Sequence, residues 1–531
     1  MLIRRVIFTG QSGIKIGSIC EDFICKASRF VRGRQRPLFL KIEDVMKNIY
    51  LKELKEADSP TRWIREILML PTPALYDLWE KAFKSVLNTI EAEENKNNDI
   101  FINLHACFYH HYTVEYLSLA KTKLVKRFRP DLFITLIDDI YDIHDRLRSR
   151  DQIFNPSYGG ATEPVGAILE LMRILDWRAK EIMMTRHFAN ELGVPHYVFA
   201  VKHLYDTLDK LIFENEPKFY ISHPISEVRR LQKGEEEKKE KANQVIEAIH
   251  RLENKSSSEF VSFLPTTIDE LRIQQEERDG KTVVYMPKLM SRWDSERYQN
   301  PINLLFVPPP ARKSDPLWEK GSEHSRELHL LLKALYDHIE VQVSSRDHKL
   351  VEQSNFLFVY RPCFNGNVSS GVMKEIQYYM ILTGSRSDKN CFIYMPTEDQ
   401  NKLKIRQLED ILGSKIESGV IACYNGESIT LNHEEENKLI TAGNNIDNLI
   451  EVFKEIMDNK SLSYVGVRHG LESDMTQKAI DFITQTAREY ISNLDQHIST
   501  YKQAATVLWE DDNLSPEILI DKTIEYLRKN K

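Results

Sequence analysis

Short apolar runs alternate with helix-forming stretches in the first part of the chain. The runs are Arg5–Thr9, Asp99–His105, Pro130–Asp139 and Pro195–Val201. The third run is apolar almost throughout until it reaches two aspartates, which is typical of a parallel strand buried on both faces. Because strands and helices alternate, this pattern predicts an α/β fold with a doubly wound parallel sheet.

A second set of strand-like runs follows. Lys218–Ile225 indicates a strand and a polar turn before a long helix-forming stretch, Phe263–Pro265 indicates a strand entering a proline turn, and Phe356–Tyr360 is a short aromatic strand. Further along, residues 449–457 and 477–505 show apolar positions at helical spacing. The pattern predicts a second, Rossmann-like α/β domain followed by a helical C-terminal tail.

Length and composition set the expected domain boundaries. A chain of 531 residues exceeds what one hydrophobic core usually supports. We place the domains at 1–215, 216–436 with an insertion at about 279–316, and 437–531. The insertion, which contains three consecutive prolines, is expected to be a loop or lid. Its Trp293 and Tyr298 could stack on a base or serve as packing anchors.

A glycine-rich loop directly follows the first strand. Its sequence is GQSGIKIGS, from Gly10 to Ser18, and a helical stretch comes next. Glycines permit a tight turn whose N–H groups and helix start can cradle a phosphate, and a lysine adds positive charge. The segment resembles the P-loop of nucleotide kinases such as adenylate kinases. The resemblance implies nucleotide binding by Gly10, Ser12, Gly13, Lys15, Gly17 and Ser18.

This loop departs from the family pattern in one respect. Ile16-Gly17 separates Lys15 from Ser18, whereas the family has its lysine directly before the hydroxyl residue that binds magnesium. We therefore expect nucleotide binding more than efficient phosphoryl transfer, because transfer depends on close positioning of lysine and metal. A degenerate P-loop kept for its fold is the structural alternative.

The strand that ends at Asp138 and Asp139 completes the resemblance. An aspartate at this place in P-loop proteins holds Mg²⁺ or its water, so the resemblance implies Asp138 as a metal residue and ATP or another nucleotide with Mg²⁺ as the ligand. Arg146 and Arg150, on the helix that follows, are implied to lie near the phosphates. Simple helix capping by the two aspartates is the alternative.

The segment from Asp347 to Glu375 carries the second chemical signal. The strand Phe356–Tyr360 leads into a small-residue turn that ends with Ser369, Ser370 and Gly371. A helix beginning at Val372 would place Glu375 in its first turn, where unpaired N–H groups and the helix dipole keep a carboxylate ionised. Such a carboxylate could attack a sugar carbon, although a glutamate there is also common for capping alone.

Together with Lys218–Ile225, this segment resembles the nucleoside 2-deoxyribosyltransferase family. The resemblance implies that Glu375 is the nucleophile, that Tyr220 orients it and that Asp347 lies near the exchanged base. Ser369, Ser370, Gly371 and His223 are implied to contact substrate. The family often has an acidic residue where this chain has Ser369, so the general acid is left open between Asp347, the first candidate, and His223.

Composition narrows the classes of function. The formal net charge of −7 argues against broad nucleic-acid binding. No run approaches the ~18 apolar residues of a membrane span, and the N-terminus lacks a signal-peptide pattern, so we expect a cytoplasmic protein without a membrane segment. The six cysteines form no CxxC pair, and His105, His110 and His111 lack partners at ligand spacing, which argues against zinc.

These observations predict a nucleotide-regulated N-glycosyl hydrolase or transferase. Its substrate would be a nucleoside, a nucleotide or an NAD-like molecule, and its architecture is similar to that of bacterial antiviral effectors. A bifunctional salvage enzyme, combining kinase and deoxyribosyltransferase, and a non-catalytic nucleotide-binding regulator are the alternatives. Related transferases complete their pockets with a neighbouring chain, so the resemblance also implies a homo-oligomer.

Overall fold

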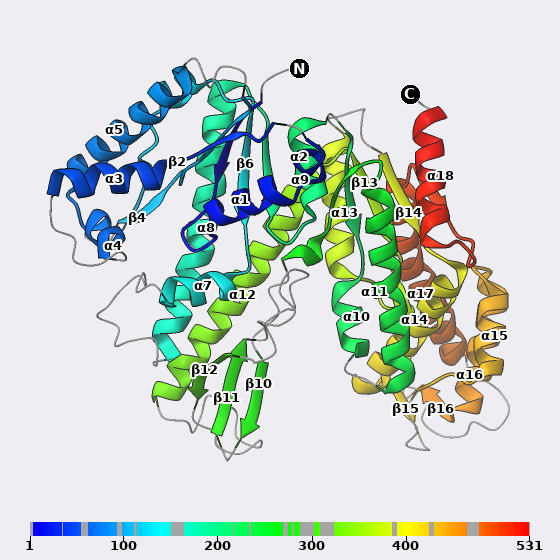
Figure 1. Ribbon diagram of the computed structural model, residues 1–531. Coiled ribbons are helices and arrows are strands. Elements are labelled where there is room, and N and C mark those ends of the chain that lie inside the picture. Colours follow the sequence, from blue (N-terminus) through cyan, green and yellow to red (C-terminus); the bar gives the residue numbers. More distant parts are fainter. Residues whose placement is uncertain are drawn as a thin grey trace. The chain divides into compact units, whose positions relative to one another are not determined.

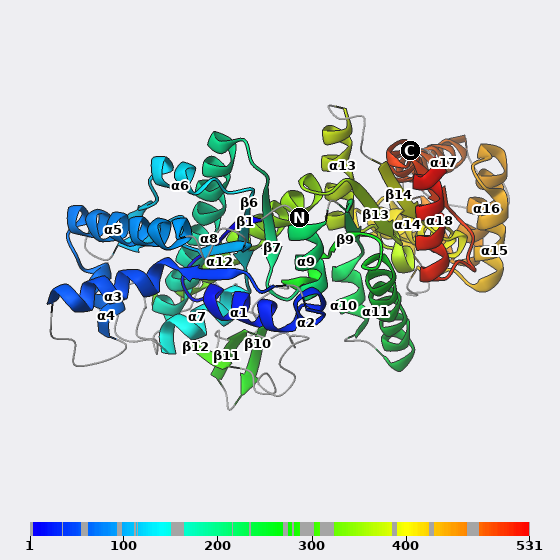
Figure 2. The ribbon, with the colours of Figure 1, turned by 45° about the horizontal axis from the view of Figure 1, so that its top comes forward.

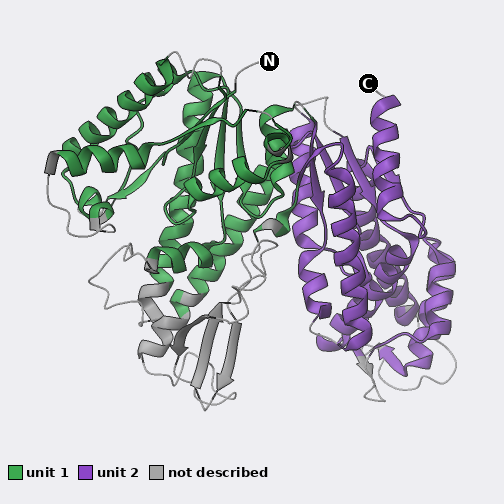
Figure 3. Ribbon diagram, in the orientation of Figure 1, with its two compact units in different colours: residues 1–216, 263–353 green, residues 217–262, 354–531 purple. Residues whose placement is uncertain are grey.

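The chain forms two compact units, which Figure 3 colours separately. Unit 1 consists of residues 1–216 and 263–353, and unit 2 of residues 217–262 and 354–531. Residues 263–353, which the sequence pattern assigns to the second domain, thus group with unit 1. The computed structural model describes residues 4–33, 35–54, 62–92, 98–110, 113, 115–149, 164–214, 216–232, 235–268, 274–278, 281–286, 302–307, 323–384, 390–423, 429–464 and 477–529.

Unit 1 is built on a parallel sheet, as the alternating pattern predicts (Figure 1). The strand order is β2-β3-β1-β6-β7, and every neighbouring pair is parallel. The strands are β1 (Arg5–Thr9), β2 (Leu38–Lys41), β3 (Ile100–Asn103), β6 (Leu132–Ile137) and β7 (His196–Ala200). The four predicted strands are confirmed. The strand β2 was not predicted, because its four residues are only half-buried and form no clear apolar run.

The two faces of this sheet bury different side chains. On one face, Phe8 and Phe101 meet edge to face, and Phe23 of α1 stacks on Phe101. On the other face, Ile7 and Ile102 belong to a core cluster shared with other helices. The face with the aromatic side chains is covered by α1 (Ile16–Lys26) and α9 (Tyr205–Phe213). The face with the core cluster is covered by α3 (Ile42–Leu54), α5 (Thr72–Glu91) and α8 (Pro164–Leu192). Burial on both faces explains why these strands are apolar throughout.

The remaining elements of unit 1 connect or extend this core. They are α2 (Ser28–Val31), α4 (Arg62–Leu68), β4 (Phe108–His110), β5 (Glu115–Leu117), α6 (Thr122–Phe128), α7 (Ile140–Ser149), η3 (Pro265–Thr267) and α12 (Glu323–Glu352). The expected lid at 279–316 contains two antiparallel strands instead of a loop alone, β11 (Lys281–Met286) and β12 (Ile302–Val307), and β11 also pairs with β10 (Gln274–Arg278), which precedes it. Trp293 and Tyr298 lie outside the described residues.

Unit 2 contains a second parallel sheet, in the order β17-β14-β13-β8-β9. The strands are β8 (Lys218–Ser222), β9 (Val261–Phe263), β13 (Phe356–Tyr360), β14 (Asn390–Tyr394) and β17 (Val507–Trp509). On one face, Phe392 stacks on Trp509 and meets Tyr526 of α18 edge to face. The register pairs Leu357 with Tyr220, so these two residues share the opposite face.

Helices complete unit 2. They are α10 (Ile225–Gln232), α11 (Glu236–Ser256), α13 (Ser370–Thr383), α14 (Thr397–Glu417), α15 (His433–Ala442), α16 (Ile446–Asn459), α17 (Gln477–Ala504) and α18 (Pro516–Lys529), with η4 (Phe364–Gly366) and the short pair β15 (Ile421–Cys423) and β16 (Leu462–Tyr464). Consecutive members of the series α15, α16 and α17 pack against each other (Figure 2). The C-terminal region is largely helical, but β17 joins the sheet. Among the described residues, no helix has the length and apolar character needed to cross a bilayer.

Candidate functional site

The carboxylate of Glu375 is held by two hydroxyl groups from β8. Tyr220 donates its hydroxyl to Oε1 of Glu375 at 2.7 Å, and Ser222 donates to Oε2. All three residues are buried, with Glu375 only 7% exposed. Both carboxylate oxygens therefore receive a hydrogen bond, as a buried charged group requires. The structure brings together the predicted nucleophile and the predicted tyrosine.

Strand alternation explains how β8 supplies both donors. Tyr220 and Ser222 are two residues apart, so they point to the same face of the sheet, and α13 carries Glu375 against that face. The sequence analysis missed Ser222, although its spacing from Tyr220 was the available signal. Because parallel strands end at one edge of a sheet, this site lies where open α/β folds bind ligands.

The helix that carries Glu375 begins earlier than predicted. It starts at Ser370, and the side chain of Ser369 accepts a hydrogen bond from the N–H of Val372 at 3.4 Å. Glu375 therefore lies beyond the first turn, and the prediction that unpaired N–H groups stabilise its charge is wrong. The two β8 hydroxyls take that role instead. Ser369 caps the helix, while Ser370 and Gly371 are exposed at its start.

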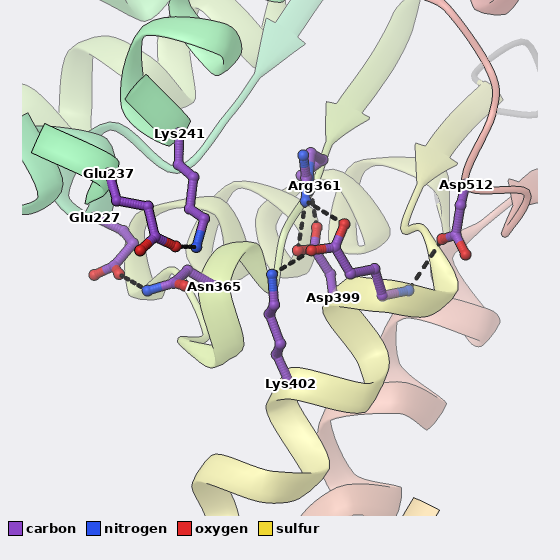
Figure 4. Close-up of polar contacts among 9 residues, drawn as sticks. Glu227, Glu237, Lys241, Arg361, Asn365, Asp399, Lys402 and Asp512 are labelled. Atoms are coloured by element: carbon purple, nitrogen blue, oxygen red, sulfur yellow. Dashed lines mark hydrogen bonds and ion pairs between the residues drawn. The ribbon is translucent and has the colours of Figure 1, made fainter. Parts of the chain in front are cut away.

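The turn between β13 and α13 is fastened to its surroundings by amide groups. Asn365 and Asn367 both donate to Oε1 of Glu227, at 3.2 and 3.1 Å. Figure 4 shows the bond from Asn365. Burial alone would raise the pKa of Glu227, but hydrogen bonds from Arg230 and the two asparagines hold it below its usual value. Gly366 has φ +77°, and a Cβ there would lie 2.8 Å from the Lys402 carbonyl oxygen. The turn therefore has little freedom to move.

A buried ion pair fixes the start of the same turn. Arg361 donates from Nε and Nη2 to the two carboxylate oxygens of Asp399, at 2.6 and 2.7 Å (Figure 4). The Asp399 side chain is fully buried and that of Arg361 is 18% exposed. Burial raises the pKa of Asp399, and the hydrogen bonds from Arg361 oppose that shift. The two-pronged geometry sets the direction in which the chain leaves β13.

His223 directly follows β8 and is buried. Its pKa is lowered to about 4, chiefly by burial and also by the nearby Arg229 and His250, while a hydrogen bond with the Ile221 backbone partly opposes the shift. Its Nδ1 has no hydrogen-bond partner among the described residues. At neutral pH the ring is therefore uncharged, which makes His223 poorly suited to donate a proton as an imidazolium.

Asp347 belongs to unit 1, not to the unit that holds Glu375. It lies on α12, where the Arg346 guanidinium contacts its Oδ1 at 2.9 and 3.0 Å. Arg346 also donates to the carbonyls of Ile268 and Pro265. The sequence-based role of Asp347 beside the base stays a prediction.

Unit 1 contains a cavity at its glycine loop, of about 210 Å³. Ser12, Gly13, Lys15, Gly17 and Ser18 line one side of it. The rest of the lining mixes polar and apolar residues, namely Ile16, Lys41, Glu43, Asp44, Met46, Trp63, Ile64, Ile67, Leu68, Asn103, His105, Phe108 and Trp177. These five predicted loop residues thus line the cavity, whereas Gly10 is not among its lining residues.

Glu181 of α8 anchors Gly10 and the segment that follows β3. The carboxylate accepts hydrogen bonds from the N–H groups of Gly10, Ala106 and Cys107, at 3.0, 2.6 and 2.8 Å. Burial raises the pKa of Glu181, while His105 and the N–H groups of Ala106 and Cys107 oppose that shift. A Cβ on Gly10 would lie 2.9 Å from the Leu136 carbonyl oxygen. No local sequence signal marks Glu181, because its partners are distant in the chain.

His105 joins this anchor. Its Nδ1 contacts the carbonyl of Gly10, and its Nε2 contacts Glu43. Burial alone would lower the pKa of His105, but the carboxylates of Glu43 and Glu181 outweigh burial and raise it to about 9. The histidine is therefore positively charged at neutral pH and lines the cavity.

Asp138 and Asp139 are both engaged by protein groups. Asp139 caps α7 by accepting from the N–H of Tyr141 at 2.9 Å, which confirms the capping alternative for this residue. Asp138 accepts from Arg146 at 2.7 Å, and the Lys202 ammonium lies 3.9 Å away. Within the described part of the chain, no group of three or more His, Cys, Asp or Glu side chains could hold a metal ion. Arg150 lies outside the described residues.

Comparison with known proteins adds no assignment: no protein-family model matches the chain, and a search of curated proteins found no match.

Proposed function

We propose that unit 2 cleaves the N-glycosidic bond of a nucleoside, nucleotide or NAD-like substrate, with Glu375 as the nucleophile. The observation that carries this proposal is the Glu375 carboxylate, which is buried and receives hydrogen bonds from Tyr220 and Ser222. A carboxylate held in this way is fixed in direction. The arrangement matches the role that the family resemblance implies for the tyrosine and the glutamate.

The reaction would proceed by two displacements at C1′. An oxygen of Glu375 attacks C1′, so a C–O ester bond forms while the C1′–N bond breaks and the base leaves with the bonding electron pair. A general acid protonates the departing base. Water then attacks C1′, the ester bond breaks and the carboxylate is regenerated, while the proton released by water restores the acid. A second base in place of water would give transfer instead of hydrolysis.

The departing base must receive a proton from a general acid. Asp347 remains the first candidate, as the resemblance implies. His223 is disfavoured because its lowered pKa of about 4 leaves it without the needed proton at neutral pH. An oligomer, in which a neighbouring chain completes the pocket, is part of the same proposal.

Unit 1 would regulate this chemistry by binding a nucleotide at the glycine loop. The cavity beside Lys15 and Ser18 supports a ligand site. A nucleotide-binding unit fused to a base-releasing unit suits controlled depletion of nucleotides, as in bacterial antiviral effectors. The salvage-enzyme alternative requires phosphoryl transfer from ATP that Lys15→Ala abolishes. The regulator alternative requires thermal stabilisation by nucleotides without release of any base.

One experiment separates these possibilities. Purified protein is incubated with nucleosides, nucleotides and NAD, and the products are separated by chromatography. The proposal expects a free base from at least one substrate and none from the Glu375→Gln variant. Full base release by that variant from every active substrate would show that Glu375 is not the nucleophile.

A further inference from the structure

Each carboxylate oxygen of Asp138 accepts a hydrogen bond from the protein. Its Oδ1 accepts from the N–H of Asp139 at 2.8 Å, and its Oδ2 accepts from Nη1 of Arg146 at 2.7 Å. The Lys202 ammonium lies 3.3 Å from Asp142 and 3.9 Å from Asp138. The Asp138 side chain is only 1% exposed. Arg146 and Lys202 thus accompany the three buried carboxylates of Asp138, Asp139 and Asp142, and the guanidinium already supplies positive charge at Asp138.

Arg146 also connects this aspartate to the glycine loop. The same Nη1 that bonds to Asp138 donates to the carbonyl of Gly13 at 3.0 Å. A metal ion at Asp138 would have to displace the guanidinium, which would leave both Arg146 and the Gly13 carbonyl without these bonds. The charge of the displaced guanidinium would repel the incoming cation.

Magnesium is a poor fit to the remaining groups. Mg²⁺ requires near-octahedral oxygen coordination at about 2.0–2.1 Å, usually by carboxylates, hydroxyls and phosphate together. The loop hydroxyl of Ser18 is two residues out of register from Lys15, and the carboxylate expected to help it is engaged by Arg146. The residues at this place therefore do not match the metal that the P-loop resemblance implies.

The cavity nevertheless has features that a nucleotide would use. Asn103, at the end of β3, lines it and is 5% exposed, and its side-chain oxygen accepts no hydrogen bond from the described residues. A buried acceptor of this kind requires an N–H or O–H donor, which a sugar hydroxyl or a base amino group supplies. Lys15 and Lys41 line the cavity and supply positive charge for an anion, whereas the charge of His105 is offset by Glu43. The aromatic rings of Trp63 and Trp177 suit a base.

We propose that unit 1 binds a nucleotide at this cavity without a divalent cation at Asp138, and so serves as a nucleotide sensor that does not transfer phosphate. The inference rests on the nucleotide binding proposed above and specifies how it occurs. Arg146 takes the place of the metal as the positive charge that holds Asp138 and the loop together. The sensor is thereby independent of magnesium.

The full-length protein tests this by calorimetric titration with ATP and with AMP, each in magnesium buffer and in EDTA. The inference expects dissociation constants that differ by less than about threefold between the two buffers, and no ADP formed from ATP with or without an added nucleoside. Affinity for either probe that rises more than tenfold with magnesium, or steady ADP production, overturns it. Absence of binding in both buffers overturns the nucleotide assignment as well.

A variant gives a second readout. Asn103→Leu removes the buried acceptor, so ATP should bind at least tenfold more weakly in both buffers, while inorganic tripolyphosphate, which has no base or sugar, should bind as before. If the affinities for ATP and tripolyphosphate fall equally, or if neither affinity falls, the assigned role of Asn103 is overturned. Base release is measured separately through Glu375, so failure of the sensor and failure of the glycosidase are distinguishable.

Discussion

Tyr220 donates its hydroxyl to Oε1 of Glu375 at 2.7 Å, although the two residues are 155 positions apart in the sequence. The bond joins β8 to α13 on one face of the unit 2 sheet, and Ser222 adds a second bond from the same strand. A purely structural carboxylate would need the same donors, because any buried charge must be hydrogen-bonded. Experiments on this triad must therefore measure chemistry and stability separately.

Replacement of Glu375 by glutamine should abolish base release. The amide is nearly isosteric but cannot form the covalent intermediate, so the rate should fall by about a thousandfold or more, the scale seen when a nucleophile is removed from other covalent enzymes. Glu451→Gln is the matched control, since its side chain is 73% exposed on α16. The rate of base release by each variant is measured by chromatography, and circular dichroism confirms that each variant is folded. A Glu375→Gln rate within tenfold of the parent would contradict the nucleophile assignment.

Removal of either hydroxyl donor should slow the reaction without unfolding unit 2. A hydrogen bond to a charged group contributes about 1.5–3 kcal/mol, which corresponds to roughly a 10–100-fold change in rate. Tyr220→Phe and Ser222→Ala should each lower kcat by this factor. Because both hydroxyls act on one carboxylate, the change in activation free energy of the double variant should differ from the sum of the changes in the two single variants.

Tyr379→Phe is the control for this pair of variants. It lies on the same helix and is buried, and its hydroxyl donates to the Asn355 carbonyl at 3.4 Å. Its kcat should match that of the parent protein. If Tyr220→Phe lowered the melting temperature while kcat stayed unchanged, the tyrosine would be a structural group only.

The sequence pattern predicted several strands of both sheets, and the family resemblance implied the pairing of Glu375 with Tyr220. The apolar runs at β6 and β13 are buried on both faces, and such runs leave a clear signal in the sequence. The start of α13 was misplaced because Ser369, a good capping residue, precedes two small residues that permit either helix or turn. The strand β17 was missed because only three half-buried residues form it, after a long helix.

The sequence could not predict the hydrogen-bond partners that only the fold brings together. Arg146 lies eight positions from Asp138, yet only the fold shows that its guanidinium occupies the aspartate and also reaches Gly13. Glu181 holds the glycine loop from a helix more than 170 positions away. Side chains that act across such distances carry no periodicity and follow no local motif. Their roles depend on the strand order, which brings β1 and β6 together.

Loss of the Asp399 carboxylate should strongly destabilise unit 2. Asp399→Asn leaves the Arg361 guanidinium without its charged partner in a buried position, and breaking such a pair costs about 3–5 kcal/mol. Urea unfolding followed by tryptophan fluorescence measures the change in the free energy of unfolding. Glu237→Gln is the control, because its bond to Lys241 lies on an exposed helix surface and should contribute nothing measurable (Figure 4). Similar midpoints for both variants would contradict the importance of the buried pair.

His223 should make unit 2 less stable in mild acid. Burial lowers its pKa to about 4, whereas an unfolded histidine has a pKa near 6.5. Between these values the unfolded chain binds a proton that the folded chain does not, so stability falls as the pH falls from about 6.5 to about 4, by up to roughly 1.4 kcal/mol per pH unit. Above pH 7 the ring is neutral in both states and contributes no pH dependence.

The variant His223→Gln isolates this effect. Its free energy of unfolding should change less between pH 7 and pH 5 than that of the parent protein, because a glutamine does not titrate. Other buried histidines, such as His196, whose pKa burial lowers to about 3, titrate equally in both proteins and cancel in the comparison. His433→Gln, at a position where the side chain is 90% exposed, should keep the slope of the parent. Equal slopes for the parent and His223→Gln would show that His223 is solvated, and the site around Glu375 would then be open to water at the end of β8.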